Sequence, residues 1–537
     1  MMFFSSGILG MLFSCAPAPE QNDSLKLLPP REQLIRLSVD LRGVHPTEDD
    51  LSAIDNAPHL YEDFVDRYLE DPRYLERMRQ VFNQRFLTRT GANYGQMVQG
   101  YSNVQVASAI GDEPLQLLTH IIKNDLPYTD IVTANYTMAN PVLAQVWELQ
   151  TEAAESGWTL AHYTDGRPHA GILSMNAMWQ RYPSEGGNAN RHRANAVSKV
   201  LLCDDYLSRP VVISRAAVDQ LTQDPENAIA DNPSCQSCHS SLDPLASHFY
   251  GFFPIEEEDD TTVYKPENEE GWRMYTDKEG AYFGIPTANL VELGEAIAED
   301  PRFVDCAVRT AWEGLTQRDY TDADWSEFQR HRDAFEASEL SVRHLTRSIV
   351  MSDEYRVKNV EDDELSERLS GVKVVNPYQL SNIIEDITGY SWTMNGVNIL
   401  TNQGLGVPVL LGGLDGDNVS KRNYNPSVGL SFVQERLAQA AGWHVAQHDL
   451  SPDREGEAIL LHYVTYKDTP DNNPEAFETQ IEFLYLRATG KPLAEDGTET
   501  QELMQLWDQL HSIKASPTLA WAGIVSAVLR DPSIIVY

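Results

Sequence analysis

The sequence has 537 residues, which predicts three or four domains at about 100–200 residues each. Hydrophobic residues make up 42% of the chain and the mean hydropathy is −0.39, while 29 Pro and 32 Gly are ordinary numbers for this length. This composition excludes a polytopic membrane protein and a disordered chain. The 80 Asp and Glu outnumber the 41 Lys and Arg, for a net charge of −39. Such a field repels phosphate backbones, so we expect no nucleic-acid partner.

The N-terminus predicts export and a lipid anchor. Residues 3–13 form an apolar run that is too short to span a bilayer and has the length of the apolar core of a signal peptide. The run ends in Leu-Phe-Ser-Cys, which resembles the bacterial lipobox. The resemblance implies a signal peptide over 1–15, lipidation of Cys15, and an outer-membrane lipoprotein that faces the periplasm or the cell surface. No Lys or Arg precedes the run, so a start further upstream and a buried N-terminal strand stay open.

Helices dominate the prediction after a Pro-rich polar spacer over 16–30. Apolar residues recur at helical spacing, with charged residues between them, in seven segments: 60–69, 115–122, 196–202, 303–315, 342–349, 477–486 and 520–529. Strand signals are few and short. The clearest are 459–464 and 407–411, the second an edge strand at most because Pro408 has no N–H to donate. The sequence therefore predicts a mainly α, multidomain fold.

Three segments share one faint plan, namely residues 34–74, 308–355 and 483–537. Each reads as a helix, a turn containing Gly and a basic residue, an acidic helix start, and a closing helix that ends near Asp and Tyr. Generic helix caps produce the same pattern. We therefore keep both an internal repeat and a chance likeness of helical hairpins.

The motif that carries chemistry is Cys235-Gln-Ser-Cys238-His239. It has the C-x-x-C-H spacing of c-type haem attachment, in which two thiols bind the haem vinyl groups and the next imidazole reaches the iron. Only five cysteines occur in the chain, so chance alone would rarely produce this spacing. The motif predicts one covalent haem c, with His239 as an axial iron ligand.

Three other interpretations of the motif remain. A structural zinc site would need four ligands, and Cys203 with His192 or His248 could complete Cys235 and Cys238. A thioredoxin-like redox pair would need a βαβ frame, which the pattern lacks. The third alternative is a plain disulfide between the two neighbouring cysteines.

The sequence around the motif resembles a known family. Residues 171–254, with C-x-x-C-H followed by Asp243-Pro244, look like the cytochrome c-like domain of large extracytoplasmic proteins of planctomycetes and myxobacteria. One position departs from the pattern, since the family usually has Gly where this chain has Ala246. The flanking segments resemble the helical companion domains of that family. The resemblance implies an N-terminal helical domain over 31–155, a haem domain over 156–290, a helical companion over 291–358 and a C-terminal helical domain over 370–537.

The sixth position of the iron decides between a carrier and a catalyst. A Met or His there gives a closed electron-transfer site, whereas an open position admits a small ligand. The sequence offers four candidates, Met175, Met178, Met274 and His248. The two methionines of the segment GILSMNAMW come first because that segment accompanies the haem motif in the family.

Other residues near the motif each have two possible interpretations. Arg191 and Arg193 could pair with haem propionates, or begin a solvated helix. Asp243 reads as a cap or turn after the motif, with an outer-shell role near the haem as the alternative. Cys203 and Cys306 are the leftover cysteines, and in an oxidising compartment we expect a disulfide between them rather than two buried thiols.

Together these features predict an exported, lipid-anchored, mono-haem c-type cytochrome that exchanges electrons with an envelope oxidoreductase. The acidic charge predicts a partner with a basic docking face. One alternative is a haem enzyme, either peroxidase-like or oxidative and catabolic. The other is a non-catalytic envelope scaffold whose helical domains bind a partner or a glycan. No hydrolase, metalloprotease or nucleotide-binding motif is present in the sequence.

Overall fold

The computed structural model describes ten stretches of the chain: residues 25–90, 98–151, 156–184, 186–210, 215–223, 232–253, 264–360, 372–454, 456–494 and 496–537. The expected signal peptide with Cys15 and most of the expected spacer lie outside these residues. Among the helices that the structure describes, none combines the length and the apolar composition that a bilayer crossing requires.

The protein is mainly α and multidomain, as the sequence predicts. The first half of the chain contains α1 (Pro30–Arg42), α2 (Glu48–Asn56), α3 (Tyr61–Leu69), α4 (Pro72–Phe86), α5 (Asn103–Lys123), α6 (Asp130–Thr133), α7 (Pro141–Val146), α8 (Asn176–Arg181), α9 (Arg191–Leu201), α10 (Arg215–Gln223) and α12 (Pro233–Ala246). The second half contains α13 (Trp272–Tyr275), α14 (Leu290–Ala298), α15 (Pro301–Thr316), α16 (Trp325–Ala337), α17 (Val342–Val350), α18 (Asp353–Arg356), α20 (Pro377–Thr388), α21 (Val407–Leu410), α22 (Val428–Asp449), α23 (Pro474–Thr489), α24 (Thr498–Lys514) and α25 (Pro517–Val528).

The strands are short, and every described pair is antiparallel. Strand β1 (Leu25–Leu27) pairs with β7 (Val357–Val360), and a three-stranded sheet has the order β2 (Thr137–Ala139), β4 (Thr159–His162), β3 (Gln150–Thr151). Two hairpins complete the set, β5 (Ala281–Tyr282) with β6 (Ile285–Pro286) and β8 (Thr393–Met394) with β9 (Val397–Asn398). The sheets are too small to form a core, so the helices must supply it.

Each of the seven segments with helical spacing lies in a helix, to within one residue at its ends, and local signals set the ends of these helices. Helix α15 shows why: Asp300 precedes it and accepts a hydrogen bond from the Arg302 amide, and Pro301 occupies the first turn. The helix ends at Gln317, whose left-handed backbone turns the chain away. Capping and apolar spacing therefore agree in this element.

Both predicted strands in the C-terminal half are wrong. Residues 407–411 contain α21, and Pro408 lies in the first helical turn, where no N–H is needed. Residues 459–464 contain no strand. Instead, the Asp449 carboxylate accepts hydrogen bonds from the amides of Ile459, Leu460 and Leu461. A buried side chain thus satisfies the backbone donors that a neighbouring strand would otherwise bind.

The apolar clusters of the core do not coincide with the expected domains. One continuous cluster includes Leu34, Met175, Leu245 and Tyr355, and so joins parts of the expected N-terminal, haem and companion domains. A second cluster belongs to the C-terminal helices, yet it also includes Ile35 and Val39 of α1. A small third cluster packs α5 against the β2-β4-β3 sheet. Helix α1 therefore has one face in each of the two main cores.

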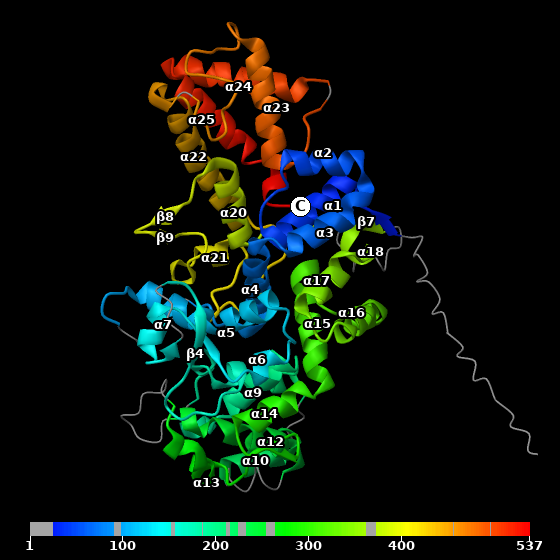
Figure 1. The fold of residues 1–537 in the computed structure, drawn as a ribbon, viewed down its shortest axis with the longest axis vertical. Coiled ribbons are helices and arrows are strands. Elements are labelled where there is room, and N and C mark those ends of the chain that lie inside the picture. The colour runs from blue at the N-terminus through cyan, green and yellow to red at the C-terminus, as the bar shows by residue number, and fades with distance from the viewer. Residues whose placement is uncertain are drawn as a thin grey trace, which may run out of the picture.

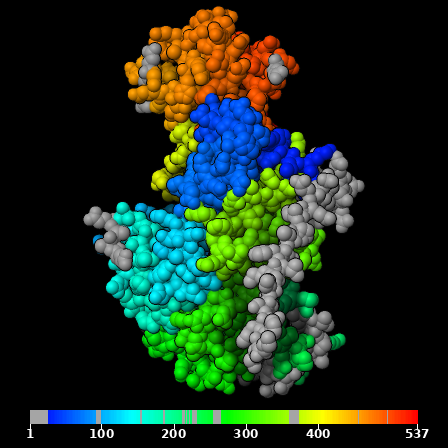
Figure 2. Space-filling model, turned by 45° about the vertical axis from the view of Figure 1, so that its right-hand side comes forward, coloured from blue at the N-terminus to red at the C-terminus, as the bar shows by residue number. Residues whose placement is uncertain are grey.

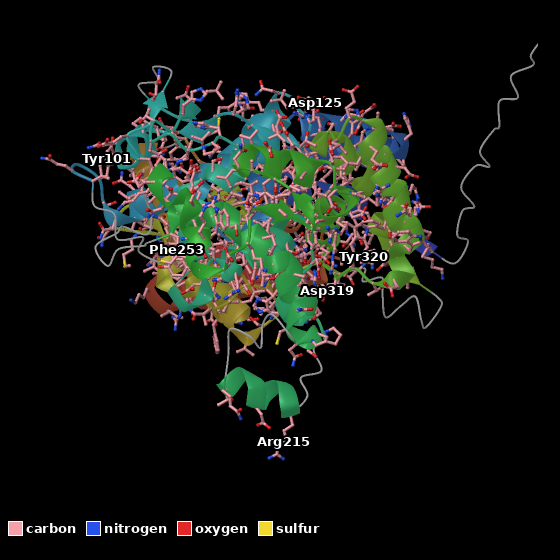
Figure 3. The ribbon with its side chains drawn as sticks, turned by 90° about the horizontal axis from the view of Figure 1, so that it is seen from below. Tyr101, Asp125, Arg215, Phe253, Asp319 and Tyr320 are labelled. Carbon is pink, nitrogen blue, oxygen red and sulfur yellow. A yellow bond between two sulfur atoms is a disulfide. The ribbon has the colours of Figure 1, made fainter. Side chains whose placement is uncertain are left out.

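The molecule is elongated, and α1 lies at its waist. Helices α22 to α25 form one end, the region of α9, α12 and α14 forms the other, and α1 to α3 lie between them (Figures 1 and 2). Seen from below, α10, which carries Arg215, projects away from the body (Figure 3). The expected haem motif on α12 is thus far from the C-terminal helices.

Buried Asp40 of α1 connects distant parts of the chain at this waist. Its carboxylate accepts hydrogen bonds from Tyr355 Oη (2.7 Å), Lys373 Nζ (2.7 Å) and Tyr537 Oη (2.6 Å). The side chains of Asp40 and Lys373 are 1% and 3% exposed. The three donors come from different segments, so this one carboxylate holds three parts of the chain against α1.

The faint repeat corresponds to three sets of helices with the same order. The sets are α1-α2-α3, α15-α16-α17 and α23-α24-α25. In each set the first helix ends at a residue with left-handed backbone, Gly43, Gln317 or Gly490. The order of elements matches the plan read from the sequence.

Candidate functional site

Helix α12 carries the C-x-x-C-H motif in its first turns. The side chain of Asn232 accepts a hydrogen bond from the Ser234 amide, and Pro233 starts the helix. Cys235 and Cys238 are both free and partly exposed. Because residues three apart lie on one helix face, both thiols belong to the same side of α12.

A carboxylate on the next helical turn holds His239. Its Nδ1 lies 2.9 Å from Asp243 Oδ1. Arg191 of α9 binds the same carboxylate, with Nε 2.6 Å from Oδ1 and Nη2 3.2 Å from Oδ2. Asp243 is buried, whereas the His239 side chain is 25% exposed. The carboxylate joins α12 to α9 and orients an imidazole that remains accessible.

This contact also fixes which imidazole nitrogen carries the proton. Burial alone would raise the pKa of Asp243, but the hydrogen bonds from His239 and Arg191 and the charge of Arg191 hold that pKa below its ordinary value. An ionised carboxylate only accepts, so His239 Nδ1 is the donor of this hydrogen bond, and in the neutral imidazole Nε2 is then the nitrogen with the lone pair. Carboxylates orient metal-binding histidines in this way. Asp243 therefore does not cap the helix, as its primary reading suggested, but lies within it beside His239.

Arg193 is a buried cation with unused donors. Its Nη1 donates to Asn190 Oδ1 and to the Phe252 carbonyl, both at 3.0 Å. Its Nε and Nη2 are buried and have no partner among the described residues. Burial lowers the pKa of Arg193 to about 9. Two free donors on a desolvated cation are costly, and they suit an anionic group such as a propionate.

The four candidates for the sixth iron ligand have different surroundings. Met175 and Met178 are buried in the main core, while Met274 is 75% exposed on α13. Both ring nitrogens of His248 have partners: Nδ1 lies 3.1 Å from the Leu245 carbonyl oxygen, and Nε2 lies 2.9 Å from Thr287 Oγ1. Burial lowers the pKa of His248, which keeps it neutral in these contacts. Its local bonds already satisfy the imidazole.

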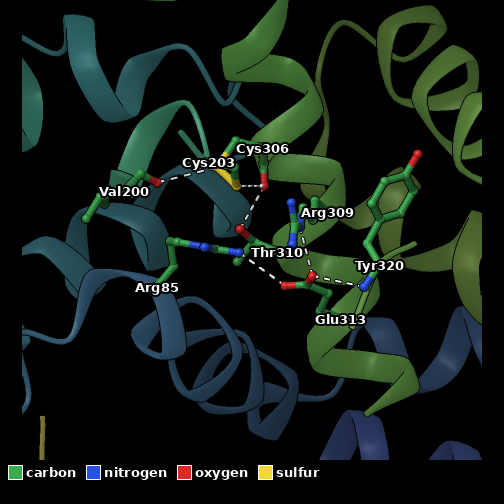
Figure 4. The surroundings of a disulfide bond; sticks show 8 residues. All are labelled: Arg85, Val200, Cys203, Cys306, Arg309, Thr310, Glu313 and Tyr320. Atoms are coloured by element: carbon green, nitrogen blue, oxygen red, sulfur yellow. Dashed lines mark hydrogen bonds and ion pairs between the residues drawn. A yellow bond between two sulfur atoms is a disulfide. The ribbon is translucent and has the colours of Figure 1, made fainter. Parts of the chain in front are cut away.

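Cys203 and Cys306 form a disulfide with an S–S distance of 2.10 Å. The bond ties the chain after α9 to α15, next to a polar cluster (Figure 4). In that cluster Glu313 binds Arg85 of α4 (3.1 Å) and Arg309 (2.8 Å). The leftover cysteines therefore join two segments that lie on either side of the C-x-x-C-H motif in the sequence.

The structure does not assemble the competing sites. Cys203 is in the disulfide, and the ring nitrogens of His248 are occupied. Across the described ranges, no group of three or more His, Cys, Asp or Glu residues could hold a metal ion. The antiparallel pairing of every described strand also provides no βαβ frame for a thioredoxin-like pair.

The residues of α12 and α9 fit a covalently bound haem. The porphyrin itself supplies four iron ligands, so the protein needs only the two thiols and one imidazole nitrogen. Cys235 and Cys238 are unpaired and accessible, and His239 presents Nε2. The free donors of Arg193 suit a propionate. At Ala246 the backbone angles are φ −60° and ψ −27°, so the departure from Gly leaves an ordinary helical residue.

The sequence reasoning missed a cavity formed by α5 and the β8–β9 hairpin. The dipeptide Asn395-Gly396 between two short extended runs is a strong hairpin signal and could have placed β8 and β9. No local signal indicates that this hairpin meets α5, some 290 residues earlier in the chain.

Comparison with known proteins supports the resemblance only at the N-terminal end. The family described as "PSD4: Protein of unknown function (DUF1592)" matches residues 36–149, and this domain is found in planctomycete cytochrome c-like proteins. The matched segment runs from α1 to the end of the α7 region and does not include the C-x-x-C-H motif. Searches of the curated proteins and of the solved structures each gave no match. The chain thus contains a segment similar to a domain of unknown function that accompanies cytochrome c-like proteins.

Proposed function

We propose that this protein is an exported mono-haem c-type cytochrome that exchanges electrons with an oxidoreductase of the bacterial cell envelope. The observation that carries the proposal is the arrangement on α12: two free thiols three residues apart and an adjacent His239 whose Nδ1 is held by Asp243. A lipid on Cys15 would tether the chain to the outer membrane. Haem, when bound, supplies one-electron chemistry at its iron.

The chain's own residues would hold and tune the group. Cys235 and Cys238 attach it, and His239 Nε2 binds the iron. Asp243 accepts a hydrogen bond from Nδ1–H, which raises the basicity of the imidazole and favours the oxidised iron. Arg191 shares that carboxylate and so limits the charge it offers to His239. Arg193 offers its free donors to a propionate.

The test is covalent haem on the full chain, produced in a host with c-type maturation machinery. A denaturing haem stain and a pyridine haemochrome spectrum compare the wild type with Cys235→Ala/Cys238→Ala. The matched control, Cys203→Ala/Cys306→Ala, also removes two sulfurs but leaves the motif. We expect haem on the wild type and the control and none on the motif variant. A wild type without covalent haem, with maturation confirmed on a known cytochrome, would overturn the proposal and favour the scaffold.

A second candidate function is a haem enzyme that binds a small oxidant. It is supported by the surroundings of the sixth-ligand candidates, because His248 is fully bonded, Met274 is on the surface, and Met175 and Met178 are core residues. A proximal carboxylate–imidazole pair also suits iron in high oxidation states. Carbon monoxide added to the reduced protein separates the two functions. Rapid binding supports the enzyme, and a Met-ligated spectrum without binding supports the carrier.

The acidic charge of the chain predicts how a partner associates. With a net charge of −39, a redox partner that docks by charge would present a basic face, and its association rate would fall as salt rises. Stopped-flow mixing with the isolated partner at several ionic strengths measures this rate. A rate independent of salt contradicts electrostatic docking and leaves the haem assignment untouched.

A further inference from the structure

A cavity of about 380 Å³ lies between two regions that are distant in the sequence. One wall is the N-terminal half of α5 with Arg89. The other is Tyr378 of α20, the end of the β8–β9 hairpin and the turn at 401–404. This volume falls within the range of about 300–1,000 Å³ that small-molecule sites occupy, and such sites favour junctions between structural units.

The charges of the cavity are already balanced. Arg89 Nε lies 2.6 Å from Asp112 Oδ1, and its Nη1 lies 2.8 Å from Glu76 Oε1. Arg79 also binds Glu76, at 2.6 Å. Burial alone would raise the pKa of Glu76, but these arginines lower it to about 2, so the Glu76 carboxylate remains ionised. Of these four groups only Arg89 and Asp112 line the cavity, and they pair with each other. The described lining therefore offers no spare charge to an ionic ligand.

The remaining polar groups are neutral and include unused ones. Asn402 stands before a short 3₁₀ turn, but its side chain makes no capping hydrogen bond. Gln403 donates its Nε2 to Tyr378 Oη at 3.3 Å, while its Oε1 is buried without a partner among the described residues. Asn103 and Ser108 are exposed on α5 at the cavity. Amides and hydroxyls both donate and accept, as sugar hydroxyls do.

Apolar surface is interspersed with these groups. Val104, Ala107 and Val397 line the same cavity beside the Tyr378 ring. A ligand that matches both must carry many hydroxyls, some C–H surface and no charge. We propose that this cavity binds a neutral saccharide of one or two rings. The proposal is independent of haem and goes beyond the electron-transfer function.

The test uses the full chain, with its fold checked by circular dichroism. An array of immobilised neutral and acidic glycans identifies a bound sugar, and isothermal titration with that free sugar measures its affinity. Ser108→Trp fills the cavity from an exposed helix position, and Asn402→Ala removes an unused amide. Ser512→Trp, on an exposed position of α24, is the matched control.

We expect a neutral glycan to bind the wild type and the control equally, and both cavity variants to bind it at least ten-fold more weakly. Three results would overturn the proposal: no neutral glycan is retained, acidic glycans bind better than neutral ones, or Ser108→Trp binds as the wild type does. Haem content of the same preparations is measured separately, so failure here does not bear on the cytochrome.

Discussion

Asp40 and Asp243 are both buried aspartates that gather donors from other segments, yet their surroundings differ in one respect. Around Asp40, Tyr355 and Lys373 are buried and Tyr537 is partly buried, and only 3% of the Lys373 side chain is exposed. The site around Asp243 includes His239, which is one quarter exposed and keeps Nε2 unengaged among the described residues. Asp40 only ties its partners together. Asp243 also orients His239, whose Nε2 stays available for a further bond.

The comparison separates structural from functional use of the same chemistry. A fully buried network rigidifies a junction, and it is destabilising when one member is removed. A network with one accessible member instead positions that member. Glu113 provides a third case, because it is buried and receives two hydroxyl donors but no cation. The predictions below use these three carboxylates and one surface pair.

The largest effect is expected at Asp40. Asp40→Asn leaves Lys373 buried without a counter-charge, and breaking such a pair costs about 3–5 kcal/mol. Urea unfolding of the full chain at pH 6 measures this loss. Asp40→Asn/Lys373→Met removes both charges and should recover much of it. A single variant within 1 kcal/mol of the wild type, by the same measurement, would show that the waist does not depend on this pair.

The next effect is a pH dependence at Glu113. Burial is the largest influence and outweighs the hydrogen bonds of Tyr163 and Thr137, so the pKa of Glu113 rises from 4.5 to about 7. Between these values the folded state holds a proton that the unfolded state has lost, so this contribution to stability falls as pH rises, by up to about 1.4 kcal/mol per pH unit. Glu113→Gln removes the slope.

Unfolding of wild type and Glu113→Gln at pH 5, 6 and 7 isolates the effect, since all other groups titrate in both. As pH rises, the free energy of unfolding of the wild type should fall relative to that of Glu113→Gln. A constant difference would mean that Glu113 is ionised in the fold at pH 5.

Asp243→Asn should have a moderate effect on stability and a specific effect on haem. The neutral amide can still accept from His239, so we expect a loss of about 1–2 kcal/mol. It no longer offers a charge to the imidazole, so the reduction potential should rise while covalent haem remains. Spectroelectrochemistry measures the potential, with Ser240→Ala, at an exposed position of the same helix outside the motif, as the control. An unchanged potential with haem attached would assign Asp243 to packing alone.

The smallest effect is expected at a surface pair. Lys421 lies 2.6 Å from Asp319, and the two side chains are 70% and 60% exposed. Solvent screens such a pair, so Lys421→Ala should change stability by less than about 1 kcal/mol. Urea unfolding at low and high salt checks this. A loss of stability as large as that of Asp40→Asn would show that burial does not decide how much a charged pair contributes.

Local sequence patterns predicted those parts of the structure that depend on residues close together in the sequence. Apolar spacing located the helices, and the motif spacing singled out Cys235, Cys238 and His239, which the structure places on one helix. The segment 459–464 failed because its backbone partner, Asp449, comes from the preceding helix and leaves no mark on the segment's own pattern. The His239–Asp243 contact was available from the i, i+4 spacing. The role of Arg191 was not, since it depends on how α9 crosses α12.

Helix α1 was a missed signal of another kind. Its apolar residues do not form a single stripe: Leu34 and Leu37 face one core, and Ile35 and Val39 face the other. A helix that is apolar on two sides is buried on two sides. The sequence therefore contained the sign that α1 joins two units, but the identity of the second unit, made more than 330 residues later, could not be read from it.

The contacts of Asp40 also set an order of events during synthesis. Tyr537 lies 497 positions after Asp40, and Lys373 lies 333 positions after it. At roughly 5–20 residues per second, α1 emerges well before the segments that neutralise its carboxylate and cover its second apolar face. The contacts of the first helix of the fold are therefore among the last to be completed.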